Sequence, residues 1–196
     1  MLDTHGRAVV QPIISKTAFV FLKMGLKANH VTIIAFLIGI FASVLVYLKQ
    51  PVAGVAVLWL SGFLDAVDGS MARRSKTSTP WGTVLDVTLD RIVEAGILVA
   101  LAFRHQDPSV LLWFLFLAIS IIFTMTVFLT VGALSEKESM KSFYYQPGLA
   151  ERTEGFILFS LMVLFQSHIV FWTIVFLIVE IITGLQRLIE AYKILK

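Results

Sequence analysis

Asp65-Ala-Val-Asp68-Gly69-Ser-Met-Ala72-Arg73, followed after eight residues by Gly82-Thr-Val-Leu-Asp86-Val-Thr-Leu-Asp90, is the stretch that decides how this chain is organised. It places four aspartates close together in a chain that is otherwise strongly apolar. A charged side chain inside a membrane helix costs at least about 2.5 kcal/mol. Four such side chains in one stretch therefore indicate a functional site.

The composition predicts an integral membrane protein. Of 196 residues, 58% are hydrophobic and 15% are charged, and the mean hydropathy is +0.87, far above that of soluble domains. Cysteine is absent from the sequence, which excludes disulfides, thiolate catalysis and cysteine-ligated metal centres. The net charge is only +3, and the sequence shows no basic face with interleaved aromatics. Nucleic-acid binding is therefore not expected. Polar residues within residues 1–16 interrupt the apolar core that a signal peptide requires, so we expect no cleaved signal peptide.

The chain contains six apolar segments, each about as long as a membrane-spanning helix. A spanning helix needs about 20 mostly apolar residues. The predicted spans are residues 30–48, 52–73, 82–103, 109–134, 153–168 and 169–187. Before them, residues 8–26 mix apolar residues with lysines, which favours a helix lying in the membrane interface over a plain cationic flank. We therefore expect an all-α integral membrane protein with one domain over residues 1–196.

Lysines and arginines occupy alternate loops, and this asymmetry predicts the orientation. They precede span one, separate spans two and three and spans four and five, and follow span six, whereas the opposite loops carry only Lys49 and Arg104. We expect both termini on the cytoplasmic side of the cell's inner membrane. The aspartates would lie near the same face, because they fall in the last turns of span two and the first turns of span three.

The spacing of the aspartates predicts a divalent-metal site. Residues three or four apart share one face of a helix, so Asp65 and Asp68 project together, and Asp86 and Asp90 form a matching stripe. Carboxylates this close would take up protons unless a cation neutralised them. Mg²⁺ and Mn²⁺ prefer oxygen ligands, and Mg²⁺ is commonly held by a few carboxylates together with substrate phosphate. One or two such ions are expected here.

Small residues accompany the carboxylates at Gly69, Ala72 and Gly82. They either allow close packing of the two helices or leave room for a ligand. Arg73 favours the ligand interpretation, because an arginine can bind a phosphate group through two parallel hydrogen bonds.

The pattern Asp-Gly-x-x-Ala-Arg, eight residues, Gly-x-x-x-Asp-x-x-x-Asp resembles the signature of the CDP-alcohol phosphatidyltransferases at every fixed position, including the additional aspartate at Asp65. The length, the six spans and the N-terminal interfacial helix are also similar to that family. Asn29-x-x-Thr32 resembles a second pattern of the family, with Ala28 where relatives often have proline. Relatives are commonly homodimers, so the resemblance implies a homodimer.

The resemblance implies transfer of a phosphatidyl group from a CDP-linked lipid, such as CDP-diacylglycerol, to the hydroxyl of an alcohol, with release of CMP. Asp65, Asp68 and Asp86 would hold the metal, with Asp90 as a shared ligand and as the catalytic base. The donor nucleotide would be bound by Asn29, Thr32, Asp65, Gly69, Ala72, Arg73 and Gly82.

The acceptor must be recognised outside this stretch. Relatives that use phosphorylated alcohols often place an arginine near the start of span five, which points to Arg152 with Glu151 beside it. Lys141 and Glu94 are further candidates for acceptor binding. The two cations, Arg152 and Lys141, favour a phosphorylated polyol as acceptor, such as glycerol 3-phosphate or inositol phosphate. The alternatives are an unphosphorylated alcohol such as serine or glycerol, and for Arg152 a purely topological role.

Two other functional classes are open. A cation or proton transporter would also place carboxylates in membrane helices, but it would need ionisable groups on a path to the far side, and spans one and four contain almost none. An assembly protein would give no reason for Arg73 and the glycines. Glu180, inside span six, is expected to face the interior of the bundle.

Overall fold

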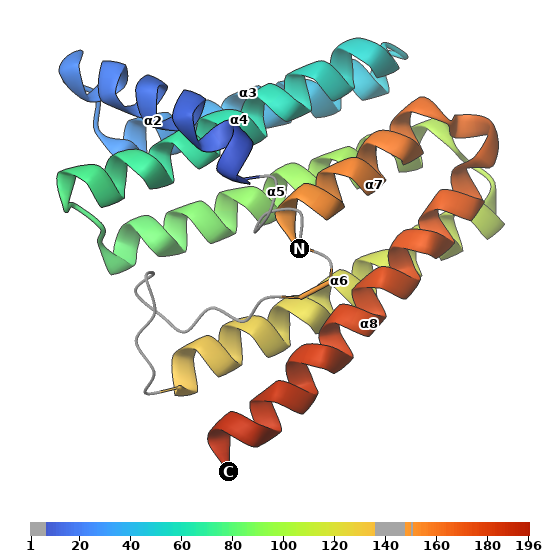
Figure 1. Cartoon of the computed structure of the whole chain (residues 1–196). Coiled ribbons are helices and arrows are strands. Elements are labelled where there is room, and N and C mark those ends of the chain that lie inside the picture. The colour runs from blue at the N-terminus through green and yellow to red at the C-terminus, as the bar shows by residue number, and fades with distance from the viewer. Residues whose placement is uncertain (1–6, 136–147, 150) are drawn as a thin grey trace. The chain divides into compact units, whose positions relative to one another are not determined.

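The computed structural model describes residues 7–135, 148–149 and 151–196, and every regular element in these ranges is a helix (Figure 1). The elements are α2 (Arg7–Lys23), α3 (Ala28–Tyr47), α4 (Pro51–Ser75), α5 (Pro80–Arg104), α6 (Pro108–Leu134), α7 (Arg152–Leu164), the short 3₁₀ helix η1 (Gln166–His168) and α8 (Ile169–Leu195). The described helices form two compact units, of which one ends at Arg104 and the other begins at His105.

Local chemistry sets the helix ends. Pro51, Pro80 and Pro108 each begin a helix, where the missing N–H of proline costs nothing and its fixed φ suits the first turn. Asp107 caps α6 by accepting a hydrogen bond from the Ser109 N–H at 2.8 Å. Lys76 ends α4 in the left-handed conformation, with φ 53°, so the chain turns into α5 within a few residues.

In the unit that ends at Arg104, α3 packs along both α4 and α5, which contact each other much less. Close packing depends on small residues of α3. The Ser61 hydroxyl of α4 donates to the Ala35 carbonyl at 2.7 Å, and a Cβ on Gly39 would lie 2.6 Å from Val93 of α5 and 2.8 Å from the Ser61 Oγ. Gly39 therefore lets α4 and α5 approach α3 from two sides, which sets where their aspartates lie.

Gly39→Ala is expected to destabilise the protein by about 2 kcal/mol, because the added methyl group overpacks a filled contact by more than its gain in helix propensity. The measurement is the thermal unfolding midpoint in detergent. Gly155→Ala is the matched control, since the nearest atom to its Cβ would be the Phe176 Cζ at 3.9 Å, an ordinary contact. Equal midpoints for the two variants would contradict the close packing at Gly39.

In the unit that begins at His105, α6 and α7 both pack against α8. The Thr124 hydroxyl of α6 donates to the Glu180 carbonyl of α8 at 2.9 Å, and Phe159 of α7 meets Phe176 of α8 edge to face at 4.9 Å. The expectation that Glu180 faces the interior is confirmed, because the residue is only 9% exposed.

Among the described helices, four are long and apolar enough to cross a membrane: α3, α4, α6 and the segment Gln166–Leu195. The all-α membrane fold is therefore supported with four candidate spans rather than six. α5 carries Asp86, Asp90, Arg91 and Glu94, and α7 has 13 residues, which is about 20 Å against a hydrocarbon core of about 30 Å.

Two predicted span ends differ from the observed helix ends by four or more residues. α7 ends at Leu164, before the predicted end at 168, because the backbone at Phe165 leaves helical geometry. α8 continues to Leu195, beyond the predicted end at 187, because Ala191 packs with Val127 and Val131 of α6 and so extends the contact between the two helices. α2 occupies the segment predicted for the interfacial helix, and its placement in a membrane stays a prediction.

Candidate active site

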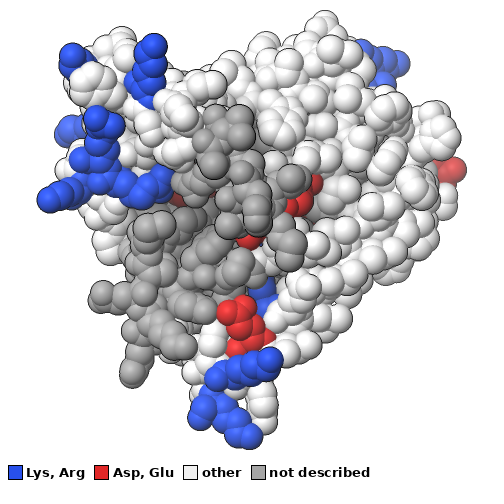
Figure 2. All heavy atoms as spheres, viewed as in Figure 1, with Lys and Arg blue, Asp and Glu red and all other residues white. Residues whose placement is uncertain are grey.

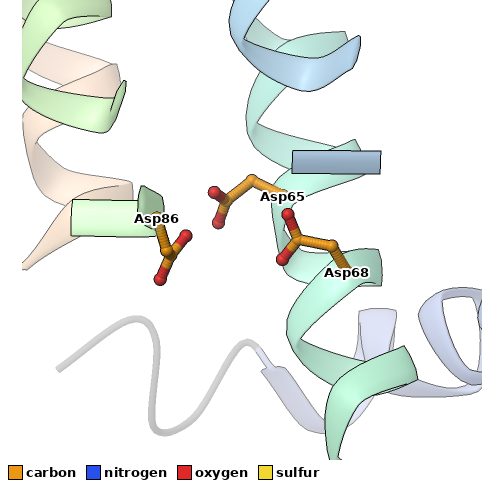
Figure 3. Close-up of side chains that lie close together, drawn as sticks. All are labelled: Asp65, Asp68 and Asp86. Atoms are coloured by element: carbon orange, nitrogen blue, oxygen red, sulfur yellow. The ribbon is translucent and has the colours of Figure 1, made fainter. Parts of the chain in front are cut away.

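Three aspartates converge between α4 and α5 (Figure 3). Asp65 and Asp68, one helical turn apart on α4, point toward Asp86 of α5, and each residue offers a carboxylate oxygen within 4.8 Å of the other two. Asp65 is 8% exposed and Asp68 5%, while Asp86 is partly exposed. The spacing rule that placed Asp65 and Asp68 on one face is thereby confirmed. The short turn between α4 and α5 brings Asp86 to them.

The donor set fits a divalent cation. Three carboxylates at this distance repel one another, and burial raises the cost of leaving their charges uncompensated. One oxygen, Asp68 Oδ2, is fully buried and has no hydrogen-bond partner in the part of the chain that the structure describes. A buried acceptor without a donor is costly unless something else occupies its lone pairs. Mg²⁺ or Mn²⁺ bound to Asp65, Asp68 and Asp86 would do so with the ligand chemistry these ions prefer.

Asp90 lies one turn beyond Asp86 on α5 and outside the group of three carboxylates. It is near enough to Asp86 and Asp68 for their charges to affect it. The next turn carries an ion pair, in which Arg91 Nη2 lies 2.6 Å from Glu94 Oε1. Arg91 is thus held by Glu94. The roles predicted for Asp90 as shared ligand and base, and for Glu94 at the acceptor, stay predictions.

The residues predicted to bind the donor nucleotide lie around the carboxylates within the same unit. Thr32 is buried on α3, its hydroxyl donates to the Ala28 carbonyl at 3.1 Å, and its side chain lies near Asp68. Asn29 lies against Gly82, since a Cβ on Gly82 would be 3.3 Å from the Asn29 Oδ1. One end of α3 therefore supplies two polar side chains to the site.

The glycines of the motif are not packing contacts between α4 and α5. Among the described residues, the nearest atoms to a Cβ on Gly69 would be those of the Arg73 guanidinium, at 3.3 Å, and a Cβ on Gly82 would meet Thr79 and Asn29. Arg73 is exposed and close enough to Asp68 to interact electrostatically. Of the two interpretations of the small residues, room for a ligand fits these contacts better, because neither glycine touches the opposing helix.

The predicted acceptor residues belong mainly to the other unit. Glu151 precedes α7 and is 7% exposed, and Arg152 begins α7 with its guanidinium carbon 5.5 Å from the centre of the Phe156 ring. Lys141 lies outside the described residues.

Arg187 was missed as a candidate because the predicted span ended at it. The structure places it inside α8, only 5% exposed, with its guanidinium carbon 4.7 Å from the centre of the Phe128 ring. A Cβ on Gly148 would be 3.2 Å from its Nε, so Gly148, four residues before Arg152, lies against this arginine. The small residues Thr183 and Gly184, one turn before Arg187, are the signal that could have placed it inside a helix bundle.

Taken together, the apolar helices and the buried carboxylates define a membrane protein whose site suits a divalent cation and phosphate groups. Comparison with known proteins specifies the class further. The sequence model of the family described as CDP-alcohol phosphatidyltransferase matches residues 26–186, across both units. The chain therefore belongs to the CDP-alcohol phosphatidyltransferase family. It is a transferase that moves a phosphatidyl-type group from a CDP-linked lipid to an alcohol hydroxyl and releases CMP.

Two relatives match this chain over nearly the full length of both proteins. The inner membrane protein YnjF of Escherichia coli (strain K12) is 31% identical over 100% of this chain and 98% of its own length. The archaetidylinositol phosphate synthase of Pyrococcus horikoshii is 30% identical over 98% of this chain and 97% of its own. The crystal structure of the Mycobacterium tuberculosis phosphatidylinositol phosphate synthase with CDP-DAG bound has a similar fold, with a TM-score of 0.75, 23% identity, and coverage of 92% of this chain and 94% of that one.

Proposed function

We propose that this chain transfers the phosphatidyl group of a CDP-linked lipid, such as CDP-diacylglycerol, to a phosphorylated polyol and releases CMP. Inositol phosphate is the favoured acceptor. The buried cluster of Asp65, Asp68 and Asp86 carries the donor half of this proposal. The acceptor half is supported by the archaetidylinositol phosphate synthase that matches nearly the whole chain. A phosphatidylinositol phosphate synthase of Streptomyces avermitilis, 32% identical over 50% of this chain and 40% of its own, gives further support.

In the proposed reaction the chain's residues bind, orient and accept a proton. Asp65, Asp68 and Asp86 would hold one or two Mg²⁺ or Mn²⁺ ions, and a bound ion would supply positive charge to the diphosphate and to the departing CMP. Asp90 accepts the proton of the attacking hydroxyl. A direct in-line displacement by the alcohol oxygen then breaks the bond to CMP and needs no enzyme nucleophile.

The donor nucleotide is proposed to lie between α3 and the start of α5. Asn29 and Thr32 would offer hydrogen bonds to the cytidine part, Gly69 and Gly82 would leave room for it, and Arg73 would pair with a phosphate. Ala72, with its small side chain, would leave space for the nucleotide beside Arg73. All belong to the unit that carries the aspartates.

Arg152 and Arg187 are proposed to bind the phosphate of the acceptor, with Glu151 orienting the polyol and with Lys141 and Glu94 as further contacts. A phosphate monoester carries nearly two negative charges, so a buried arginine such as Arg187 suits it better than a neutral alcohol. The proximity of Gly148 to Arg187 supports a common role for this arginine and the segment that leads to Arg152.

The assay is CMP release by the purified protein with CDP-diacylglycerol, Mg²⁺ or Mn²⁺ and a panel of acceptors: inositol phosphate, glycerol 3-phosphate, glycerol and serine. We expect one CMP per lipid product, a product mass that corresponds to the inositol phosphate adduct, and loss of release in EDTA. Absence of CMP release with every acceptor would overturn the proposal. Release with only serine or glycerol would overturn the acceptor assignment alone.

Arg152→Ala is expected to raise the KM for the phosphorylated acceptor about tenfold to a hundredfold, because a charge-assisted hydrogen bond contributes about 1.5–3 kcal/mol. The KM for CDP-diacylglycerol should not change. Lys193→Ala, at an exposed position near the end of α8, is the control for loss of one positive charge. An equal change in both KM values for Arg152→Ala would instead indicate a structural role.

The topology also belongs to this proposal. Six membrane-inserted helices, with both termini and the carboxylates on the cytoplasmic side, would let a lipid donor and a water-soluble acceptor reach one site. The loop charges support this orientation, because the opposite loops carry only Lys49 and Arg104 while the other loops hold most of the lysines and arginines. A homodimer is proposed from the resemblance to the family.

A further inference from the structure

A basic surface lies on the unit that carries the aspartates and has no part in the proposed reaction. We call it the α2 basic face and define it by exposed cations: Lys16, Lys23 and Lys27 of α2 and the turn after it, with Arg74 and Lys76 at the end of α4. Figure 2 shows lysines and arginines gathered over this region. The sequence has no aspartate or glutamate between Thr4 and Leu64 or between Gly69 and Leu85, so the surface carries one sign of charge.

α2 is held on the unit by one side only. Its inner side places Ile14 and Ala18 in a buried cluster with Val31 of α3 and with Val67 and Met71 of α4. Away from that cluster, α2 exposes the large apolar residues Ile13 (60%) and Val20 (45%) among the lysines, and Met24, just after the helix, is 69% exposed. Apolar side chains with interspersed lysines are the pattern of a helix whose outer side lies at the boundary between headgroups and acyl chains.

Two cations from different helices, Lys23 and Arg74, contact the ring of Phe19. Lys23 Nζ lies 4.6 Å from the centre of that ring, and the guanidinium carbon of Arg74 lies 5.0 Å from the same point. In the part of the chain that the structure describes, neither cation has a carboxylate partner. Both positive charges lie close to one exposed ring, so an anion near that ring would be attracted by both.

We propose that the α2 basic face binds the headgroups of anionic phospholipids in the surrounding membrane, with Lys23 and Arg74 as its centre. Charge complementarity selects an anion, because the five cations that define the surface are exposed and the segments that carry them, residues 5–63 and 70–84, contain no acidic residue. The apolar residues select a lipid over a soluble anion, because Ile13, Val20 and Met24 would enter the acyl boundary beneath the headgroups. The bound lipid would fix α2 against α4, next to the end of the helix that carries Asp65 and Asp68.

The test measures lipid affinity of the full chain without substrates, so its outcome does not depend on the transfer reaction. Purified protein in a neutral detergent is titrated with dioctanoyl phosphatidylglycerol or dioctanoyl phosphatidylcholine, and the shift of the thermal unfolding midpoint gives the apparent Kd. We expect saturable stabilisation by phosphatidylglycerol, little by phosphatidylcholine, and loss of the difference at high salt.

Single variants locate the site. Lys23→Gln and Arg74→Gln should each weaken the affinity for phosphatidylglycerol about fivefold, since one basic residue near an anionic lipid surface contributes about 1 kcal/mol. Phe19→Leu, which keeps every charge, should weaken it about threefold by releasing the two cations from the ring. Lys49→Gln, at the opposite end of α4, is the matched control and should not change it.

Three results would overturn the proposal. The first is equal affinity for the two lipids. The second is an equal loss of affinity in Lys23→Gln and Lys49→Gln, which would indicate an effect of net charge only. The third is unchanged affinity in all three variants of the surface, which would place the phosphatidylglycerol site elsewhere, including the donor site.

Discussion

Asp68→Asn is expected to lower the rate of CMP release about a thousandfold while the protein stays folded. Asp68 is buried, belongs to the group of three converging carboxylates, and has one oxygen without a hydrogen-bond partner in the described structure. Asparagine keeps the size of the side chain but removes its charge and one of its acceptor oxygens. A loss of about 4 kcal/mol of metal-dependent stabilisation corresponds to about three factors of ten in rate.

The measurement for Asp68→Asn is CMP release as a function of Mn²⁺ concentration, together with the thermal unfolding midpoint. The apparent Mn²⁺ affinity should weaken, so that part of the lost rate returns at high Mn²⁺. Asp107→Asn is the matched control, because Asp107 is an exposed helix cap far along the chain from the motif and asparagine is also a good cap. A wild-type metal dependence in Asp68→Asn would contradict the assignment of this residue as a ligand.

Asp90→Asn is expected to lower kcat by about a hundredfold to ten-thousandfold, the usual contribution of a general base. Asp90 lies outside the group of three carboxylates, one turn beyond Asp86, so its main role in our proposal is to accept the proton of the acceptor hydroxyl. The KM for CDP-diacylglycerol should change little, since donor binding rests on the other residues.

Mn²⁺ binding to Asp90→Asn, measured by calorimetry, separates the two roles predicted for this residue. An unchanged Mn²⁺ affinity with a large loss in kcat identifies Asp90 as a base alone, and a parallel loss of both identifies it as a shared ligand. CMP release that survives both EDTA and this substitution would refute the mechanism.

Much of this site was predictable from local spacing. Asp65 and Asp68 are three residues apart on one helix, and a helix places such residues on one face whatever surrounds it. Only the short segment 74–81 separates predicted spans two and three, so the chain returns at once and brings Asp86 back to them. The same reasoning could not exclude Asp90 from the cluster, because residues one turn apart on one helix look equivalent until the position of the facing helix is known.

Other features depend on contacts between helices distant in sequence. Hydropathy treated Arg187 as the end of a span, whereas the contact of Ala191 with Val127 and Val131 extends α8 and leaves the arginine buried. Gly39 is one glycine among 12 in the sequence, and only its proximity to Ser61 and Val93 shows why a side chain is excluded there.

The sequence by itself determined that this is an apolar, helical membrane protein with the aspartate and glycine pattern of its family, because composition and helical periodicity are local properties. Tertiary structure alone decided which carboxylates meet, that Gly69 and Gly82 do not contact the opposing helix, that Arg187 is buried, and that Lys23 and Arg74 share one aromatic ring. The physical reason is that such properties depend on how α3 positions α4 and α5, and on how α8 packs with α6, and pairing of this kind is not encoded in the residues of any single helix.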